Sequence, residues 1–202
     1  MSTSSNARDA ILGRIRQSLK RTSGDSIAAV PAARLRATDT TLPERIAQFS
    51  TALATLSGVT YPAADETSAR DYIDSVVSGR SVVVADSPMV RRCGLAYAQA
   101  AVSEAAVGIT GAEYALADTG SLVVMSAAEP RLYSLLPPVH IAVVESGRIL
   151  SGLDEFLAVV PRPADLGAST VFITGPSRTA DIEQILVRGV HGPGELHVVI
   201  LP

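Results

Sequence analysis

Apolar side chains recur at helical spacing in three stretches of the first third of the chain. The first stretch, which Ser5 or Asn6 can cap, carries Ile11, Leu12, Ile15 and Leu19 on one face. The second begins at Thr41, which has capping-box spacing with Glu44; it carries Ile46, Phe49, Leu53 and Leu56 and ends at Gly58. A third helix is predicted over residues 66–78. Between the first two, residues 22–40 are rich in small polar side chains and contain Pro31, which predicts a linker.

From residue 81 the pattern changes to short, continuous runs that are rich in β-branched residues. These runs are Ser81–Ala85, Leu122–Met125, Val139–Val144, Thr170–Thr174 and Leu196–Leu201. Such runs are typical of strands buried on both faces of a parallel sheet. Helical stretches are expected between several of them, at 66–78, 151–159 and 178–188. The chain is therefore predicted to be an α/β protein with an open, largely parallel sheet flanked by helices. It divides into an N-terminal helical arm and linker, 1–38, and an α/β domain, 39–202.

Composition narrows the classes of function. The 202 residues include one Cys and three His with no His-x-x-x-His pair, so no disulfide framework, cysteine-ligated cluster or other metal site is expected. No apolar run is long enough to span a membrane, and the N-terminus lacks the apolar core of a secretory signal. We therefore expect a cytoplasmic protein.

Charge is unevenly distributed along the chain. Residues 1–36 contain seven basic and two acidic side chains, whereas residues 37–202 contain ten basic and eighteen acidic ones. A basic arm on an acidic body can bind RNA or a membrane surface. With no Trp and one Lys, nucleic acid is disfavoured as a partner. Packing of the arm on its own body or on another subunit of a homo-oligomer is the preferred interpretation.

Two segments next to predicted strands carry polar side chains suited to chemistry. Asp118, Thr119, Gly120 and Ser121 precede one strand, and can either approach an anion closely or simply form a β-turn. His140 follows Pro137 and Pro138 at the start of another strand. It is either an acid or base near neutral pH or a hydrogen-bonded core histidine.

A third segment predicts an anion cradle. Gly175, Ser177, Arg178 and Thr179 lie between a predicted strand and the helix expected at 178–188, whose free N–H groups would attract a phosphate or carboxylate. The alternative is plain helix capping, with Asp181 and Glu183 opposing the helix dipole. Neither a Walker A loop nor a dinucleotide fingerprint is present. Beyond it, His191 lies in a glycine-rich turn and is preferred over His197, which falls within a strand. Cys93 is expected to be inert.

Four motifs together resemble the lactate-utilisation protein C family of LUD-domain proteins. They are Leu-Ala-Asp-Thr-Gly-Ser-Leu-Val at 116–123, Ser-Leu-Leu-Pro-Pro-Val-His-Ile-Ala-Val-Val at 134–144, Thr-Gly-Pro-Ser-Arg-Thr-Ala-Asp-Ile-Glu at 174–183 and Gly-Val-His-Gly-Pro-Gly-Glu-Leu-His-Val-Val-Ile-Leu at 189–201. The family often has Glu where this chain has Asp118, which shortens the reach of that side chain. The resemblance implies a fold similar to the sugar-phosphate isomerase and CoA-transferase group.

The resemblance also implies a role in bacterial oxidation of L-lactate to pyruvate, beside partner proteins that carry iron–sulfur clusters. This chain would be the component without a cluster, which binds a small organic anion or assembles with those partners. The candidate catalytic residues are His191, His140 and Asp118. The candidate substrate-binding residues are Thr119, Gly120, Ser121, Gly175, Ser177, Arg178 and Thr179. An enzyme acting on a phosphorylated sugar or a CoA-linked acid, or a pure assembly module, remains the alternative.

Overall fold

The computed structural model describes residues 3–20, 22, 40–126, 130–160, 169–180 and 186–202. The chain divides into two compact units, 1–33 and 34–202. In the first, helix α1 (Thr3–Ser18) begins before the expected caps Ser5 and Asn6 and leaves Ile11, Ile15 and Leu19 exposed. The linker predicted at 22–40 lies outside the described residues except at its two ends.

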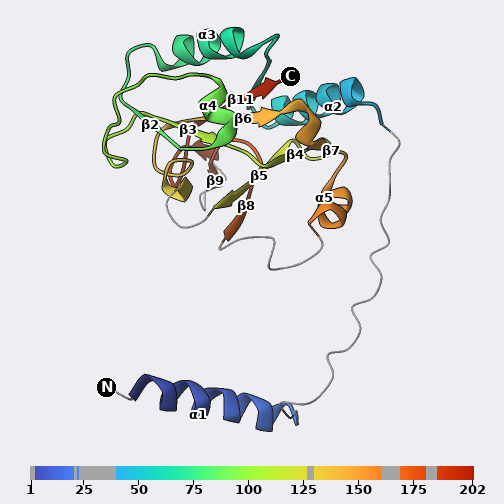
Figure 1. Ribbon diagram of the computed structural model, residues 1–202, viewed down its shortest axis with the longest axis vertical. Coiled ribbons are helices and arrows are strands. Elements are labelled where there is room, and N and C mark those ends of the chain that lie inside the picture. The colour runs from blue at the N-terminus through green and yellow to red at the C-terminus, as the bar shows by residue number, and fades with distance from the viewer. Residues whose placement is uncertain (1–2, 21, 23–39, 127–129, 161–168, 181–185) are drawn as a thin grey trace. The chain divides into compact units, whose positions relative to one another are not determined.

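The second unit alternates helices and strands along the chain (Figure 1). Its helices are α2 (Leu42–Thr55), α3 (Glu66–Val77), α4 (Pro88–Arg92) and α5 (Leu153–Val159), with 3-10 turns η1 (Pro130–Leu132) and η2 (Ser146–Arg148). Its strands are β1 (Val59–Pro62), β2 (Val82–Val84), β3 (Val107–Gly111), β4 (Tyr114–Leu116), β5 (Ser121–Ser126), β6 (Val139–Glu145), β7 (Ile149–Leu150), β8 (Ser169–Ile173), β9 (Arg178–Ala180), β10 (Leu186–Arg188) and β11 (Glu195–Leu201). No helix in the described part of the chain is both long and apolar enough to cross a bilayer.

Five strands form the main sheet in the order β1-β11-β6-β3-β2, and every neighbouring pair is parallel. β6 lies at the centre, where Ile141 is in register with His197 of β11 and Ile109 of β3. All five residues of β3 and the first six of β6 are buried, as expected for strands covered on both faces. The predicted parallel α/β sheet is confirmed.

Helices and a second sheet cover the two faces of the main sheet. On one face, Ala69, Ile73 and Val77 of α3 and Val90 of α4 pack on the apolar side chains of β3, β6 and β11. On the other face, Phe49 and Leu53 of α2 pack with β5 and with the alternate residues of β6 and β11. Helix α2 meets the sheet through the apolar stripe that its sequence predicts. The capping box also forms, because Glu44 Oε2 accepts the Thr41 N–H at 2.8 Å.

The second sheet has the order β7-β4-β5-β8, and it is mixed. β5 pairs antiparallel with both β4 and β8, whereas β4 pairs parallel with β7. Two predicted strands, Leu122–Met125 and Thr170–Thr174, thus belong to this sheet rather than to the parallel one.

The prediction of a helix over residues 178–188 is wrong. Residues 178–180 and 186–188 form strands β9 and β10, which pair antiparallel so that Arg188 lies opposite Arg178. The backbone returns on itself and is closed by the Gly189 N–H, which donates to the Ser177 carbonyl at 3.0 Å. Residues 181–185, including Asp181 and Glu183, lie outside the described residues. The anion cradle was predicted at the N-terminus of a helix, but residues 178–180 form a strand, so these described residues offer no helix N-terminus there.

Candidate functional site at the carboxyl edge of the main sheet

The carboxyl ends of the main strands lead into segments with charged side chains. Asp86 follows β2, Glu113 follows β3, and Arg148 follows β6 within η2. In open α/β sheets, ligands bind in the crevice outside these strand ends.

A cavity of about 340 Å³ opens there between the edge of the main sheet and the second sheet. It is lined by Met89, Glu113, Tyr114, Met125, Arg148, Val159 and Val160. Its volume is at the lower end of the range for small-molecule sites, about 300–1,000 Å³. We call it the carboxyl-edge cavity.

Glu113 is the acidic group of this cavity. The carboxylate is half-buried, and its Oε2 accepts the N–H of Met125 at 2.6 Å. Burial raises the pKa of Glu113, while the Met125 N–H and the positive charge of Arg148 partly oppose that shift. A carboxyl group with a raised pKa that lines a cavity is a candidate for proton transfer to or from a bound ligand.

Arg148 is the basic group of the same cavity, and its guanidinium remains half exposed. Its Nη1 donates to the Tyr114 hydroxyl at 3.1 Å, and the guanidinium carbon lies 5.3 Å from the centre of the Tyr114 ring. Stacking on an aromatic ring restricts the plane of the guanidinium. Arg148 can thus present its remaining N–H groups to a carboxylate in a restricted orientation.

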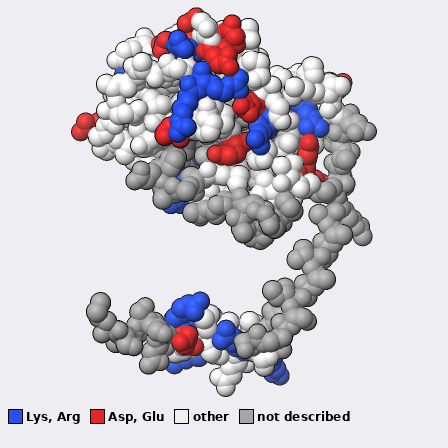
Figure 2. All heavy atoms as spheres, in the orientation of Figure 1, with Lys and Arg blue, Asp and Glu red and all other residues white. Residues whose placement is uncertain are grey.

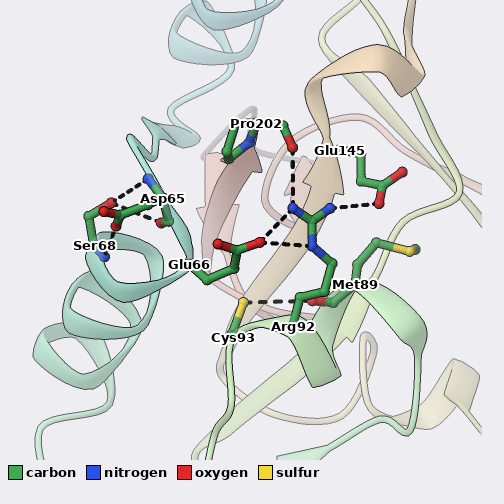
Figure 3. A network of polar contacts seen from close by, with 8 residues as sticks. All are labelled: Asp65, Glu66, Ser68, Met89, Arg92, Cys93, Glu145 and Pro202. Carbon is green, nitrogen blue, oxygen red and sulfur yellow. Dashed lines mark hydrogen bonds and ion pairs between the residues drawn. The ribbon is translucent and has the colours of Figure 1, made fainter.

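A network of ion pairs and hydrogen bonds around Arg92 links α3, α4 and the end of β6 at this edge (Figure 3). The Arg92 guanidinium contacts Glu66 Oε1 of α3 at 2.7 Å and Glu145 Oε1 of β6 at 2.8 Å, and donates to the Pro202 carbonyl at 3.3 Å. Glu145 also lies 3.9 Å from Arg148. On the face shown in Figure 2, basic and acidic side chains lie beside one another rather than in separate patches. The network fixes α3, α4 and the end of β6 relative to each other.

The Asp118–Ser121 segment contacts Thr174, at the start of the predicted anion cradle, away from the carboxyl-edge cavity. Ser121 Oγ lies 2.8 Å from both Thr119 Oγ1 and Thr174 Oγ1, so three hydroxyls form a chain. Gly120 has a φ of +66°, and a Cβ there would lie 2.6 Å from the Leu53 nitrogen of α2. A Cβ at Gly175, where φ is +85°, would lie 2.8 Å from the Leu56 Cβ. Both glycines therefore permit close packing against α2.

Asp118 lies beside α5 and does not line the carboxyl-edge cavity. Its N–H donates to the Ser151 carbonyl at 3.2 Å, and its carboxylate lies so close to Gly152 that a Cβ there would meet Oδ2 at 2.5 Å. This contact explains why Gly is needed at 152, where the chain turns into α5.

The other predicted ligands of the cradle lie near the β9–β10 pair. Arg178 donates to the Leu56 carbonyl at the end of α2, and the Arg188 Nη2 donates to Ser57 Oγ at 3.0 Å. Ser177 packs against the turn that contains Gly192, with its N–H on the Pro193 carbonyl at 2.8 Å. Thr179 is half-buried in β9. Arg178 thus interacts with the negative end of the α2 dipole.

The two candidate catalytic histidines have different surroundings. His140 is completely buried, and its Nε2 lies 2.9 Å from the Thr110 hydroxyl. Burial lowers the pKa of His140 to about 4, so the ring is neutral at pH 7. His191 is exposed and lines a second hollow, which borders the amino ends of the strands and does not include His140 or Asp118. The structure does not bring His140, His191 and Asp118 onto one cavity wall.

Glu113, Tyr114 and Arg148 were missed by the sequence analysis. Glu113 precedes the Asp118–Ser121 segment in the sequence, but nothing in its neighbours indicates that it is half-buried. Arg148 follows a strand-ending Ser-Gly pair, which is a weak sign of a loop at a strand end. Only the pairing of β4 with β5 and β7 brings the two charges to one cavity.

The single cysteine lies in the core rather than at a cavity wall. Cys93 is buried, and burial raises the pKa of its thiol although Arg92 opposes this. Across the described residues, no group of three His, Cys, Asp or Glu side chains is arranged to hold a metal ion. An iron–sulfur cluster needs several cysteine ligands, which the chain lacks.

Comparison with known proteins places the chain in a family. The family model for the LUD domain matches residues 98–201. Proteins called lactate utilization protein C are similar to it: that of Bacillus licheniformis is 35% identical over 103 residues, 48% of this chain and 43% of that protein. That of Bacillus subtilis is 39% identical over 95 residues, 45% of this chain and 40% of that protein. The match thus spans less than half of these relatives' length.

A solved structure shares the fold. The crystal structure of a DUF162 family protein from Deinococcus radiodurans aligns with a TM-score of 0.57 and 21% identity, covering 81% of this chain and 99% of that one. Because the family model accounts for more than half of the residues, the chain belongs to the LUD domain family.

Proposed function

We propose that this chain binds a small hydroxycarboxylate, with L-lactate as the first candidate, in the carboxyl-edge cavity and serves a lactate-utilisation system. The observation that carries the proposal is that Arg148 and Glu113, one cation and one half-buried carboxyl group, line the same cavity. The names of the similar proteins support the choice of lactate.

The two charged groups complement the two functional groups of a 2-hydroxy acid. A substrate carboxylate accepts hydrogen bonds from the Arg148 guanidinium, which stacking on Tyr114 holds in place. The substrate hydroxyl then faces Glu113, whose raised pKa favours proton exchange with it. Met89, Met125, Val159 and Val160 supply the apolar wall on which the methyl group packs.

Oxidation of lactate to pyruvate also removes two electrons, which need an acceptor. In this proposal the electrons pass to partner proteins that carry iron–sulfur clusters, since a chain with one cysteine cannot ligate such a cluster itself. Binding and orienting the acid is then the contribution of this chain.

Titration calorimetry of the full chain with L-lactate and pyruvate tests the binding step. Replacing Arg148 by Gln removes a charged hydrogen bond, so affinity should fall by about 10- to 100-fold. Arg91→Gln is the matched control, because Arg91 is an exposed arginine near the same edge that pairs with Asp86 outside the cavity. Burial raises the pKa of Glu113, so Glu113→Gln should remove the part of the pH dependence of the affinity that comes from this carboxyl group.

Reduction of a dye by lactate tests the wider role. It should require cluster-bearing partner proteins as well as the chain itself, and Arg148→Gln should lower the rate whereas Arg91→Gln should not. No measurable binding of either acid to the folded chain, or equal binding by Arg148→Gln, would contradict the site. Full dye reduction without this chain would contradict the role.

A further inference from the structure

A second hollow, larger than the carboxyl-edge cavity, lies at the opposite edge of the main sheet and has no part in the proposed function. Its volume is about 620 Å³. It borders the amino ends of β2, β6 and β11, and the loop 189–194 forms much of its wall. We call it the amino-edge hollow.

Three cationic or protonatable side chains line it, each from a different element. Arg80 follows α3, Arg188 ends β10, and His191 lies in the loop between β10 and β11. All three are exposed. Among the described residues that line this hollow, Glu195 is the only carboxylate, and it lies 3.8 Å from His197 Nε2. The wall is therefore positively charged.

Neither arginine is neutralised by a carboxylate within the described residues. Arg80 donates to the Val76 and Val77 carbonyls at the end of α3, and Arg188 donates to Ser57 Oγ. Arg188 also lies directly opposite Arg178 across the β9–β10 pair. Like charges at opposed positions destabilise such a pair, so this arrangement is more favourable with an anion bound beside it.

The loop adds backbone donors to the same wall. Gly189 and Gly194 use their N–H groups within the fold, donating to the Ser177 and Pro138 carbonyls. The N–H groups of Val190, His191 and Gly192 donate no hydrogen bond to another described residue. Successive free N–H groups are well suited to phosphate oxygens.

The hollow is also larger than a three-carbon acid would fill, and part of its wall is apolar. Leu135, Leu136 and Val190 each leave about half of their surface exposed at its wall, at 48%, 50% and 51%. An organic body attached to the anionic group would cover these side chains. The volume falls in the middle of the range for sites that hold drug-sized ligands.

We propose that the amino-edge hollow binds a phosphate ester with an apolar or aromatic body, of the size and charge of a nucleoside diphosphate. Arg80, Arg188 and the N–H groups of residues 190–192 hold the phosphates. Leu135, Leu136 and Val190 contact the organic body.

Titration calorimetry with ADP, adenosine and inorganic pyrophosphate tests the two halves of this proposal. ADP should bind at least 10-fold more tightly than either adenosine or pyrophosphate, and its affinity should fall as salt is raised. Arg188→Gln and Arg80→Gln should each weaken ADP by about 10- to 100-fold, as expected for a charged hydrogen bond. Arg91→Gln, on the opposite edge, should leave ADP binding unchanged.

Circular dichroism and the thermal midpoint identify any variant that fails to fold. Arg188→Lys keeps the charge, and its binding is expected to lie between that of the wild type and Arg188→Gln. The proposal is overturned if ADP at millimolar concentration does not bind the folded chain, or if the folded arginine variants bind it as well as the wild type. Equal affinity for pyrophosphate and ADP overturns the assignment of an organic body. Arg148→Gln should affect lactate but not ADP, so failure at one edge is separable from failure at the other.

Discussion

Protonation of His140 should limit the stability of this protein below neutral pH. The ring is completely buried in β6, its Nε2 contacts Thr110, and its Nδ1 has no hydrogen-bond partner. Burial lowers the pKa of His140 from 6.5 to about 4. A charged imidazole would therefore be buried without a counter-ion, which is costly.

The sign and size of the effect follow from linkage. Between pH 6.5 and 4 the unfolded chain binds a proton at His140 and the folded chain does not, so the free energy of unfolding falls as the pH falls. The loss is about 1.4 kcal/mol per pH unit and totals about 3 kcal/mol over the interval. Above pH 6.5 both states are neutral at this site, and the contribution no longer changes.

Urea unfolding of the full chain at half-unit steps from pH 7.5 to 4 measures this slope. His140→Gln, which cannot take up a proton, should lose the slope attributable to residue 140 even if it is less stable at pH 7.5. Thr110→Val is the control, because it removes the hydroxyl partner but keeps the titrating ring, so its slope should persist. Burial also lowers the pKa of His197, so the difference between wild type and His140→Gln is the quantity to compare. Parallel curves for these two proteins would refute the reasoning.

Three further predictions test the packing. Gly120→Ala places a Cβ 2.6 Å from the Leu53 nitrogen at a positive φ, and should lower the free energy of unfolding in urea by more than about 1 kcal/mol, whereas Gly147→Ala, with nothing within 4 Å, should change it by less than about 0.5 kcal/mol. Cys93, fully buried, should react with Ellman's reagent only after unfolding in urea; rapid reaction of the native protein would contradict its burial. Arg92→Met leaves Glu66 and Glu145 without their shared cation and should destabilise by about 1–2 kcal/mol, an effect that Glu145→Gln in the same chain should reduce, as a double-mutant cycle would show.

The sequence predicted the strands that are continuous apolar runs and missed those that are not. Strand β3 reads Val-Gly-Ile-Thr-Gly, and its glycines interrupt the pattern. Gly108 is needed because a Cβ there would lie 1.8 Å from the Tyr133 carbonyl, so the segment before β6 crosses the strand at that point. This contact joins residues 25 positions apart along the chain, and local pattern alone does not reveal it.

The helix predicted at 178–188 failed for a related reason. The apolar spacing of Ile182, Ile185 and Leu186 fits a helix, but Arg178, Thr179 and the residues at 186–188 pair as strands instead. Strand pairing depends on the turn between the two segments and on the neighbours beneath them, and the period of apolar side chains records neither.

The candidate site was also hard to find because its charges look like ordinary surface residues in the sequence. Glu113 and Arg148 are 35 positions apart in the sequence. They come together because β4, which follows Glu113, pairs with β5 and with β7, which follows Arg148. The polar motifs that stand out in the sequence have structural roles instead. Gly120 and Gly175 allow close packing against α2. The hydroxyls of Thr119, Ser121 and Thr174 form a chain that joins two turns.

The two hollows lie at opposite ends of the same parallel strands, and this arrangement bears on how they can communicate. β6 and β11 both run from the amino-edge hollow, at Val139 and Glu195, toward the charged carboxyl edge, at Glu145 and Pro202. Their buried interior is apolar apart from His140 and offers little that could shift between two arrangements. Ligands at the two edges should therefore bind independently, with affinities unchanged by one another. Calorimetric titration of lactate with and without saturating ADP measures the coupling directly, and a change of more than about twofold would show that the sheet does transmit it.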